Sequence, residues 1–236
     1  MTALRILISG ILFFLPGFAV ACDLALALAV DVSGSVDQKE YRVQMDGVAA
    51  GLRDPIVSEA LVRGQAQIML VQWSGSSRQE TSIPWTRITS FEDVERLAVA
   101  IETAPRPWRN FSTAVGEALS HTGAAFAKVQ HCQRRIIDVS GDGPSNEGLE
   151  PVDALPQLRR WDVTVNAIAI EASEPDLTAY FFENVIRGEG AFVITAANFA
   201  DYPAQIRRKL LREVARQTAA LPTPICANPP CMVKIQ

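Results

Sequence analysis

A continuous apolar segment that ends in a cluster of oxygen-bearing side chains constrains the fold of this sequence most strongly. Residues 24–30, Leu-Ala-Leu-Ala-Leu-Ala-Val, are followed directly by Asp31-Val-Ser-Gly-Ser35. An apolar run without alternating polar residues is typical of a parallel strand that is buried on both faces. Because the ligand crevice of an open α/β sheet lies at the carboxyl ends of its strands, the sequence predicts a central strand that ends in a polar site.

The residues Asp31, Ser33 and Ser35 alternate along a short loop, so their side-chain oxygens can converge on one position. Hard oxygen donors suit Mg²⁺, which prefers oxygen ligands and keeps several of its waters. The alternative is that both serines only cap the following helix, which is a common role of serine. This short motif by itself supports the two interpretations equally.

The composition is that of a globular chain able to build a large core, with 236 residues, 48% of them hydrophobic and 20% charged. A chain of this length suits one α/β domain with a tail. The formal net charge is −4 and no Lys/Arg-rich run occurs, so the sequence does not support nucleic-acid binding.

Residues 1–21 are typical of a secretory signal peptide. Arg5 supplies the positive charge, residues 6–15 form the apolar region, and Ala19-Val20-Ala21 matches a cleavage site. The alternative is a retained membrane anchor, but the apolar region is short and is followed by proline and glycine. We therefore expect a periplasmic or secreted protein whose mature chain begins at Cys22 and has no membrane span.

Export makes the four cysteines candidates for disulfides, and three pairings are possible. Cys22 and Cys132 each precede a predicted strand, and if these strands are parallel neighbours both cysteines lie at one end of the sheet. Cys226 and Cys231 would then close a small loop in the tail. A lipid-modified Cys22 is the disfavoured alternative, because bacterial lipoprotein signals usually have Leu where this chain has Ala19.

Apolar periodicity predicts a strand–helix alternation along the rest of the chain. The expected strands cover residues 65–73, 78–85, 134–140, 164–170 and 191–195. The expected helices cover residues 37–52, 112–128, 151–160, 175–185 and 198–218, with another beginning at Ser90. This order predicts a doubly wound α/β fold, in which a mostly parallel six-stranded sheet with one antiparallel edge strand has helices on both faces. The domain would cover residues 22–218 and be followed by a Pro-rich tail, residues 219–236.

The loop at residues 104–111 is a candidate rim for a ligand site. Arg106, Trp108 and Arg109 are residue types favoured at binding hot spots, Asn110 follows them, and two prolines stiffen the segment. The alternative is that Trp108 packs onto the domain and the arginines are simply solvated. Taken singly, these residues favour the alternative slightly, whereas the loop as a whole favours a rim.

Two further oxygen donors occur where they could join the first loop. Thr113 stands at the expected start of a helix, and Asp142 follows the strand at residues 134–140. Taken alone, Thr113 would be a helix cap and Asp142 a turn residue. The order Asp31-x-Ser33-x-Ser35, then Thr113, then Asp142-Gly143 resembles the metal-ion-dependent adhesion site (MIDAS) of von Willebrand factor type A (VWA) domains. The resemblance covers residues 22–218, and within the family it is strongest to small exported bacterial proteins of unestablished function.

The resemblance implies a role for each of the five residues. Ser33 and Ser35 would bind Mg²⁺, or Mn²⁺ or Ca²⁺, directly through their hydroxyls, and Thr113 directly or through water. Asp31 and Asp142 would act mainly through water and hydrogen bonds. Because neither carboxylate binds the cation directly, the cation stays electron-poor and attracts an external carboxylate to its open coordination position.

Two positions depart from the family pattern without removing a ligand. Ser112 precedes the threonine where relatives often have Gly, and Gly141 precedes Asp142 where they often have Thr. The resemblance implies an exported, non-enzymatic, metal-dependent module that binds an acidic group of another protein. The alternatives are a Mg²⁺-dependent hydrolase or phosphatase with Asp31 as nucleophile, which would need a second acid and a Lys at a strand end that the sequence lacks, and a structural domain with an empty site.

Overall fold

The structure, a computed structural model, describes residues 22–219 and the side chains of residues 22–215. The predicted signal peptide, the predicted tail, Cys226 and Cys231 lie outside these residues. A six-stranded sheet has the order β3-β2-β1-β4-β5-β6. Its strands are β1 (Leu24–Asp31), β2 (Gln67–Trp73), β3 (Gln79–Arg87), β4 (Arg134–Gly141), β5 (Val163–Ile170) and β6 (Val193–Ala196). All neighbouring strands are parallel except β2 and the edge strand β3, which confirms the predicted fold class.

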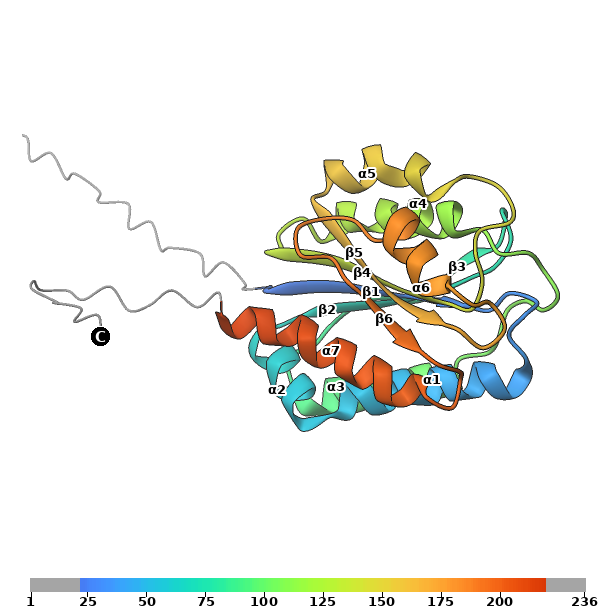
Figure 1. Cartoon of the computed structure of the whole chain (residues 1–236). Coiled ribbons are helices and arrows are strands. Elements are labelled where there is room, and N and C mark those ends of the chain that lie inside the picture. Colours follow the sequence, from blue (N-terminus) through green and yellow to red (C-terminus); the bar gives the residue numbers. More distant parts are fainter. Residues whose placement is uncertain (1–21, 220–236) are drawn as a thin grey trace, which may run out of the picture.

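Helices cover both faces of the sheet, as Figure 1 shows. One layer holds α1 (Gln38–Arg53), α2 (Pro55–Arg63), α3 (Phe91–Thr103) and α7 (Tyr202–Ala219). The other holds α4 (Val115–Ala125), α5 (Leu155–Arg160) and α6 (Leu177–Tyr180), with the short turns η1 (Phe126–Lys128), η2 (Pro151–Ala154) and η3 (Phe181–Val185). Among residues 22–219, none of the helices combines the length and apolar character that crossing a membrane requires.

The central strand β1 is buried along its whole length and divides the interior into two cores. Successive side chains of a strand point to opposite faces. Leu24, Leu26 and Leu28 enter the core beneath α1 and α7, while the intervening alanines enter the core beneath α4. The second core contains the large rings of Trp73 and Phe126, so small residues on that face of β1 leave room for them.

The loop after β1 leads into α1 as the sequence predicts. Asp37 accepts hydrogen bonds from the N–H groups of Lys39 and Glu40, and the Glu40 carboxylate accepts the N–H of Asp37, which forms a capping box. The sequence pattern did not predict α2. It begins immediately after α1 because Asp54 caps it and Pro55 occupies its first turn, where a missing N–H costs little.

The start of α4 differs from the expected start at Ser112, because the helix begins at Val115. Neither Ser112 nor Thr113 caps it. Instead Ser145, from the loop after β4, accepts the N–H of Val115 through its hydroxyl at 3.2 Å. A residue distant in sequence thus provides the cap, and the Thr113 side chain is not used for it.

The ends of three other elements also differ from the prediction. The expected helix at residues 175–185 is a single turn, α6, continued by the π-helical turn η3. The expected helix at residues 151–160 is divided into η2 and α5, and Pro156 lies in the first turn of α5, where proline is tolerated. Asn198 forms a turn by accepting the N–H of Asp201, and α7 begins at Tyr202.

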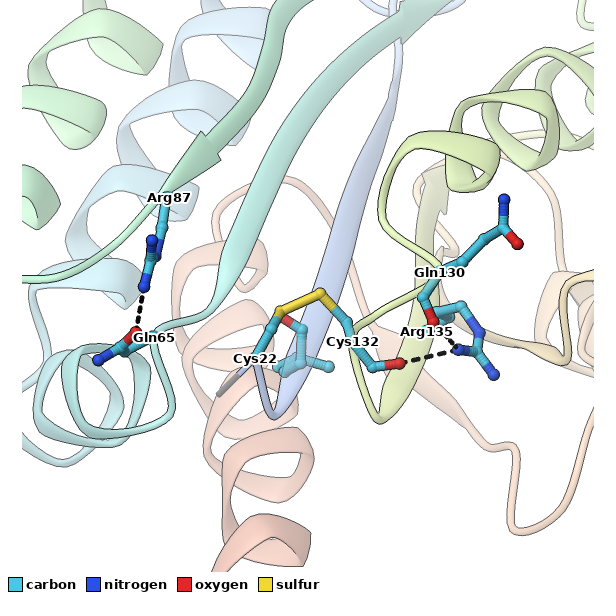
Figure 2. Close-up of a disulfide and its surroundings, with 7 residues drawn as sticks. Cys22, Gln65, Arg87, Gln130, Cys132 and Arg135 are labelled. Carbon is cyan, nitrogen blue, oxygen red and sulfur yellow. Dashed lines mark hydrogen bonds between the residues drawn. A yellow bond between two sulfur atoms is a disulfide. The ribbon is translucent and has the colours of Figure 1, made fainter. Parts of the chain in front are cut away.

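A disulfide joins Cys22 to Cys132 at the amino-terminal ends of β1 and β4, and Figure 2 shows this bond. Of the pairings that the sequence left open, this one follows from the parallel pairing of the two strands. The N–H of Gln133 donates to the Cys22 carbonyl, and Arg135 donates to the Cys132 carbonyl. The backbone of each cysteine is therefore fixed by a hydrogen bond. Because 110 residues separate them, the cross-link removes much conformational freedom from the unfolded chain.

A buried ionic cluster anchors α7 to the sheet. Lys209 is fully buried, and its ammonium group lies 2.5 Å from a carboxylate oxygen of Asp138 on β4 and 2.9 Å from one of Glu213. Asn166 on β5 donates to Glu213 at 2.8 Å and accepts the N–H of Phe192 at 3.2 Å. One cation thus serves two buried carboxylates, which leaves the cluster short of positive charge.

This shortage shows in the titration of Asp138. Burial raises the pKa of Asp138 from 3.8 to about 7, Lys209 opposes the rise, and Glu213 adds to it. Between these two values the native state keeps a proton that the unfolded chain has released. Raising the pH through this range therefore favours the unfolded chain, and stability falls.

We expect the substitution Asp138→Asn to weaken this pH dependence, because an amide does not titrate. Between about pH 4 and pH 7, the free energy of unfolding should fall less steeply for the variant than for the parent. Urea denaturation across this range measures both slopes. The control Asp162→Asn, at a side chain that is 94% exposed, should keep the parent's slope. Equal slopes for Asp138→Asn and the parent would contradict the assignment.

Candidate metal centre

The site lies at the carboxyl end of the central strand, where β1 passes into the loop before α1. Asp31 closes β1 and is fully buried, and one of its carboxylate oxygens accepts the N–H of Ser33 at 2.7 Å. Its other oxygen, Oδ2, is buried and finds no hydrogen-bond partner within the described part of the chain. A buried carboxylate oxygen of this kind is costly unless a donor or a cation satisfies it.

Parallel pairing of β1 with β4 brings the second acid to the same place. The hydroxyls of Ser33 and Ser35 lie 3.1 Å apart, and Ser35 donates to Asp142 Oδ1 at 2.6 Å. Asp142 follows the last residue of β4, and 107 residues separate it from Ser35. The structure therefore brings together four of the predicted residues: Asp31, Ser33, Ser35 and Asp142.

Thr113 lies in the segment between α3 and α4, which is bonded to the neighbouring loops. The side chain of Asn146 accepts the N–H of Thr113 at 2.9 Å, and the N–H of Asn146 donates to the Thr113 carbonyl at 2.9 Å. The Phe111 carbonyl accepts the N–H of Gly34 at 2.8 Å, so the segment is joined to the loop that carries both serines. Thr113 is 5% exposed and makes none of the helix-capping contacts expected of it.

Electrostatic repulsion between the two acids is built into the site. Burial raises the pKa of Asp31 to about 7, and the charge of Asp142 adds to the rise. The hydrogen bond from Ser33 acts in the opposite direction. Burial also raises the pKa of Asp142, against the hydrogen bond from Ser35. Two carboxylates near one another in a poorly solvated place favour a cation between them.

The residues present fit a divalent cation with a preference for oxygen. The hydroxyls of Ser33 and Ser35 and the Asp142 carboxylate form a chain of hydrogen bonds, and Asp31 accepts the backbone N–H of Ser33. Asp31 Oδ2 lacks a donor among residues 22–219. No thiol or imidazole belongs to this group, so the donor set suits Mg²⁺ or Mn²⁺ better than a soft metal. A Cβ added at Gly143 would meet nothing within 4 Å, which shows open space beside Asp142.

Two of the predicted rim residues are engaged within the protein. Arg106 is half-buried, and its guanidinium donates to the carbonyls of Val32 at 3.0 Å and Ser33 at 2.8 Å, which holds the site loop in place. Trp108 is partly buried against the core beneath α1. Arg109 and Asn110 are exposed, and Asn110 has a φ of 59°, a left-handed conformation that asparagine tolerates.

Two supporting residues were missed in the sequence, and a third, Arg106, makes contacts that the sequence did not predict. Asn146 and Ser145 hold Thr113 and the start of α4, and Arg106 acts as a loop clamp rather than as a free rim. The stretch Pro144-Ser-Asn146 has the composition of any turn, so no sequence signal distinguishes these roles.

Solved structures share this fold. Proximal thread matrix protein 1 from the mussel byssus is 20% identical with a TM-score of 0.60, over 83% of this chain and 48% of that one. Its form with a zinc-occupied MIDAS motif is 22% identical with a TM-score of 0.58, over 83% of this chain and 49% of that one. The chain spans less than half the length of these proteins.

Two bacterial structures are also similar. A von Willebrand factor type A protein from Catenulispora acidiphila is 16% identical with a TM-score of 0.57, over 82% of this chain and 43% of that one. The pilus adhesin SpaC from Lactobacillus rhamnosus GG, in an open conformation, is 10% identical with a TM-score of 0.59, over 84% of this chain and 30% of that one. The fold is therefore that of a VWA domain, as the sequence motif predicts.

The family itself is shown by the sequence. Residues 21–218 match the family described as "Protein of unknown function (DUF1194)", and the chain belongs to that family. No curated protein matches the chain significantly.

The loop after Asp142 is held close to α4 by a glycine. A Cβ at Gly116 would lie 2.2 Å from the carbonyl oxygen of Leu149 and 2.8 Å from that of Glu150. Both are backbone atoms and cannot move aside alone. The close contact between α4 and this loop therefore requires glycine at position 116.

We expect Gly116→Ala to lower the free energy of unfolding by about 1–3 kcal/mol, because the clash outweighs the better helix propensity of alanine. The matched control is Gly143→Ala, where the added methyl group meets open space. Chemical denaturation of both variants and the parent measures the effect. A Gly116→Ala variant as stable as the parent would show that the loop shifts without cost.

Proposed function

We propose that this protein is an exported, metal-dependent protein-binding module that recognises an acidic group of a partner through a divalent cation. The observation that carries the proposal is the buried Oδ2 of Asp31, which has no hydrogen-bond partner among residues 22–219, in the same loop region as Asp142 and two hydroxyls. Adhesion-type proteins of the same fold, such as the pilus adhesin SpaC, support a binding role. The zinc-occupied MIDAS motif of the mussel protein supports a divalent metal in this fold.

Mg²⁺ or Mn²⁺ is the ion we propose for the site, with Ca²⁺ as a further candidate. Ser33, Ser35 and Thr113 would supply neutral hydroxyl ligands, and Asp31 and Asp142 would hold bound waters. Neutral ligands leave the cation with most of its charge, so an external Asp or Glu side chain gains a strong interaction. The chain's own role is to orient these oxygens and to exclude competing donors from the buried side of the site.

Export is part of the proposal. Residues 1–21 have the pattern of a signal peptide, and the Cys22–Cys132 disulfide is typical of an oxidising compartment. We propose a periplasmic or secreted protein, with the module covering residues 22–218.

A hydrolase with Asp31 as its nucleophile is the weaker proposal. The Asp31 side chain is fully buried, so it presents no exposed oxygen to a substrate phosphorus or carbonyl carbon. Lys209, which pairs with Asp138 on β4, is fully buried beneath α7 rather than at the site.

Calorimetric titration of the mature protein with Mg²⁺ and Mn²⁺, with acetate present as a simple carboxylate, tests metal binding. We expect binding by the parent and at least a tenfold loss in the Asp31→Ala, Ser33→Ala double variant, because a ligand and its supporting acid are removed. The control Asp46→Ala changes an exposed acid on α1 and should bind like the parent.

A folded parent that binds neither ion, with or without acetate, would overturn the metal-dependent function. The five residues would then belong to a structural domain that binds no metal. If the ions bind, affinity capture of partners with Mg²⁺ and with a chelator separates metal-dependent partners from the rest.

A further inference from the structure

An aromatic ring and a guanidinium group form a partly exposed pair on segments that adjoin the metal-site loop. The guanidinium carbon of Arg78 lies 3.6 Å from the centre of the Phe111 ring, a stacked cation–π contact. Phe111 remains 39% exposed with Arg78 in place, and it belongs to neither hydrophobic core. We call these two side chains the Phe111–Arg78 platform.

The platform is joined to the loop that carries the metal-site hydroxyls. The Phe111 carbonyl accepts the N–H of Gly34, the residue between Ser33 and Ser35, at 2.8 Å. A Cβ at Gly34 would lie 3.2 Å from that same carbonyl oxygen, so the two segments are in close contact. The Phe111 backbone therefore lies directly beside the loop that carries Ser33 and Ser35.

The turn that carries Arg78 is fixed to the same segment. Ser74 donates its hydroxyl to the Ser112 carbonyl at 3.0 Å, and its own carbonyl accepts the N–H of Ala114 at 3.0 Å. Glu147 accepts hydrogen bonds from the hydroxyl and N–H of Ser76 at 2.9 and 3.2 Å, which ties the turn to the loop after Asp142. The platform therefore stands on loops that are joined by hydrogen bonds to one another and to the loops of the metal site.

Charges of both signs surround the platform. Arg78 and the exposed Arg109 add positive charge, and hydrogen bonds from Ser76 and the charge of Arg78 keep the pKa of Glu147 low, so Glu147 is a carboxylate that partly offsets Arg78. Exposed aromatic rings that are held by a rigid frame are the usual anchors of binding interfaces, because they bury much area for little loss of side-chain freedom.

We propose that the Phe111–Arg78 platform is the second contact of the metal site, and that it selects partner segments with an aromatic or large aliphatic side chain within two residues of the metal-binding Asp or Glu. This inference rests on the proposed function. In an extended segment, two residues span about 7 Å, which lets one side chain reach the cation while its neighbour covers the Phe111 ring. The partner's acidic side chain binds the ion, and the platform selects the apolar residue next to that acid in the partner segment.

The test uses a displayed library of heptapeptides with a central Asp or Glu and random flanking residues, together with a matched library whose central residue is Asn or Gln. The mature protein is loaded with Mg²⁺, and bound peptides are released with a chelator. For the parent, we expect peptides with a central acid to be selected, with aromatic or large aliphatic residues within two positions of it enriched about tenfold. In Phe111→Ala, Mg²⁺ binding and the preference for the acid should remain, and the flanking enrichment should disappear.

The control Phe182→Ala removes an equally large ring that is 65% exposed on η3 and should leave both preferences intact. Selection of acids without flanking enrichment, or enrichment that survives in Phe111→Ala, would overturn the platform while the metal-dependent function stands. Absence of any chelator-dependent selection of acids would overturn both.

Discussion

The parallel pairing of β1 with β4 is the constraint on which the rest of the structure depends. It places Asp31 at the end of one strand beside Asp142 after the other, and it brings Cys22 and Cys132 together at the opposite ends. Burying two acids side by side is unfavourable unless positive charge or hydrogen bonds compensate. The organisation of the surrounding loops follows from meeting that requirement.

Two acids at or just after β4 are compensated in different ways, although only four positions separate them along the chain. Asp138 lies in the core and is compensated from within the chain by Lys209 of α7. Asp142 lies at the site, where it accepts the hydroxyl of Ser35, and a backbone hydrogen bond and the positive charge of Arg106 also act to lower its pKa. A lysine thus pairs directly with the acid in the core, whereas hydrogen bonds and the nearby Arg106 act on the acid at the proposed metal site.

The loops around the site form one bonded unit rather than separate segments. Gly34 is joined to Phe111, Ser74 to Ala114, and Asn146 to Thr113, each by a backbone hydrogen bond. A partner bound at the cation would therefore meet a rim of fixed geometry, and the Phe111 ring is the apolar part of that rim. Preorganisation of this kind lowers the entropic cost of binding.

The sequence by itself determined the local features of this protein: the buried strand β1, the capping box at Asp37, the order of strands and helices, and the positions of the oxygen donors. These follow from short-range patterns, since the periodicity and capping preferences of neighbouring residues produce them. Only the tertiary structure decided which residues meet across long separations. Ser145 rather than Ser112 caps α4, Cys22 pairs with Cys132, Lys209 finds Asp138, and Arg106 clamps the loop instead of lining a rim. Each of these contacts joins segments whose proximity depends on how the whole sheet is assembled, and a local pattern carries no information about that assembly.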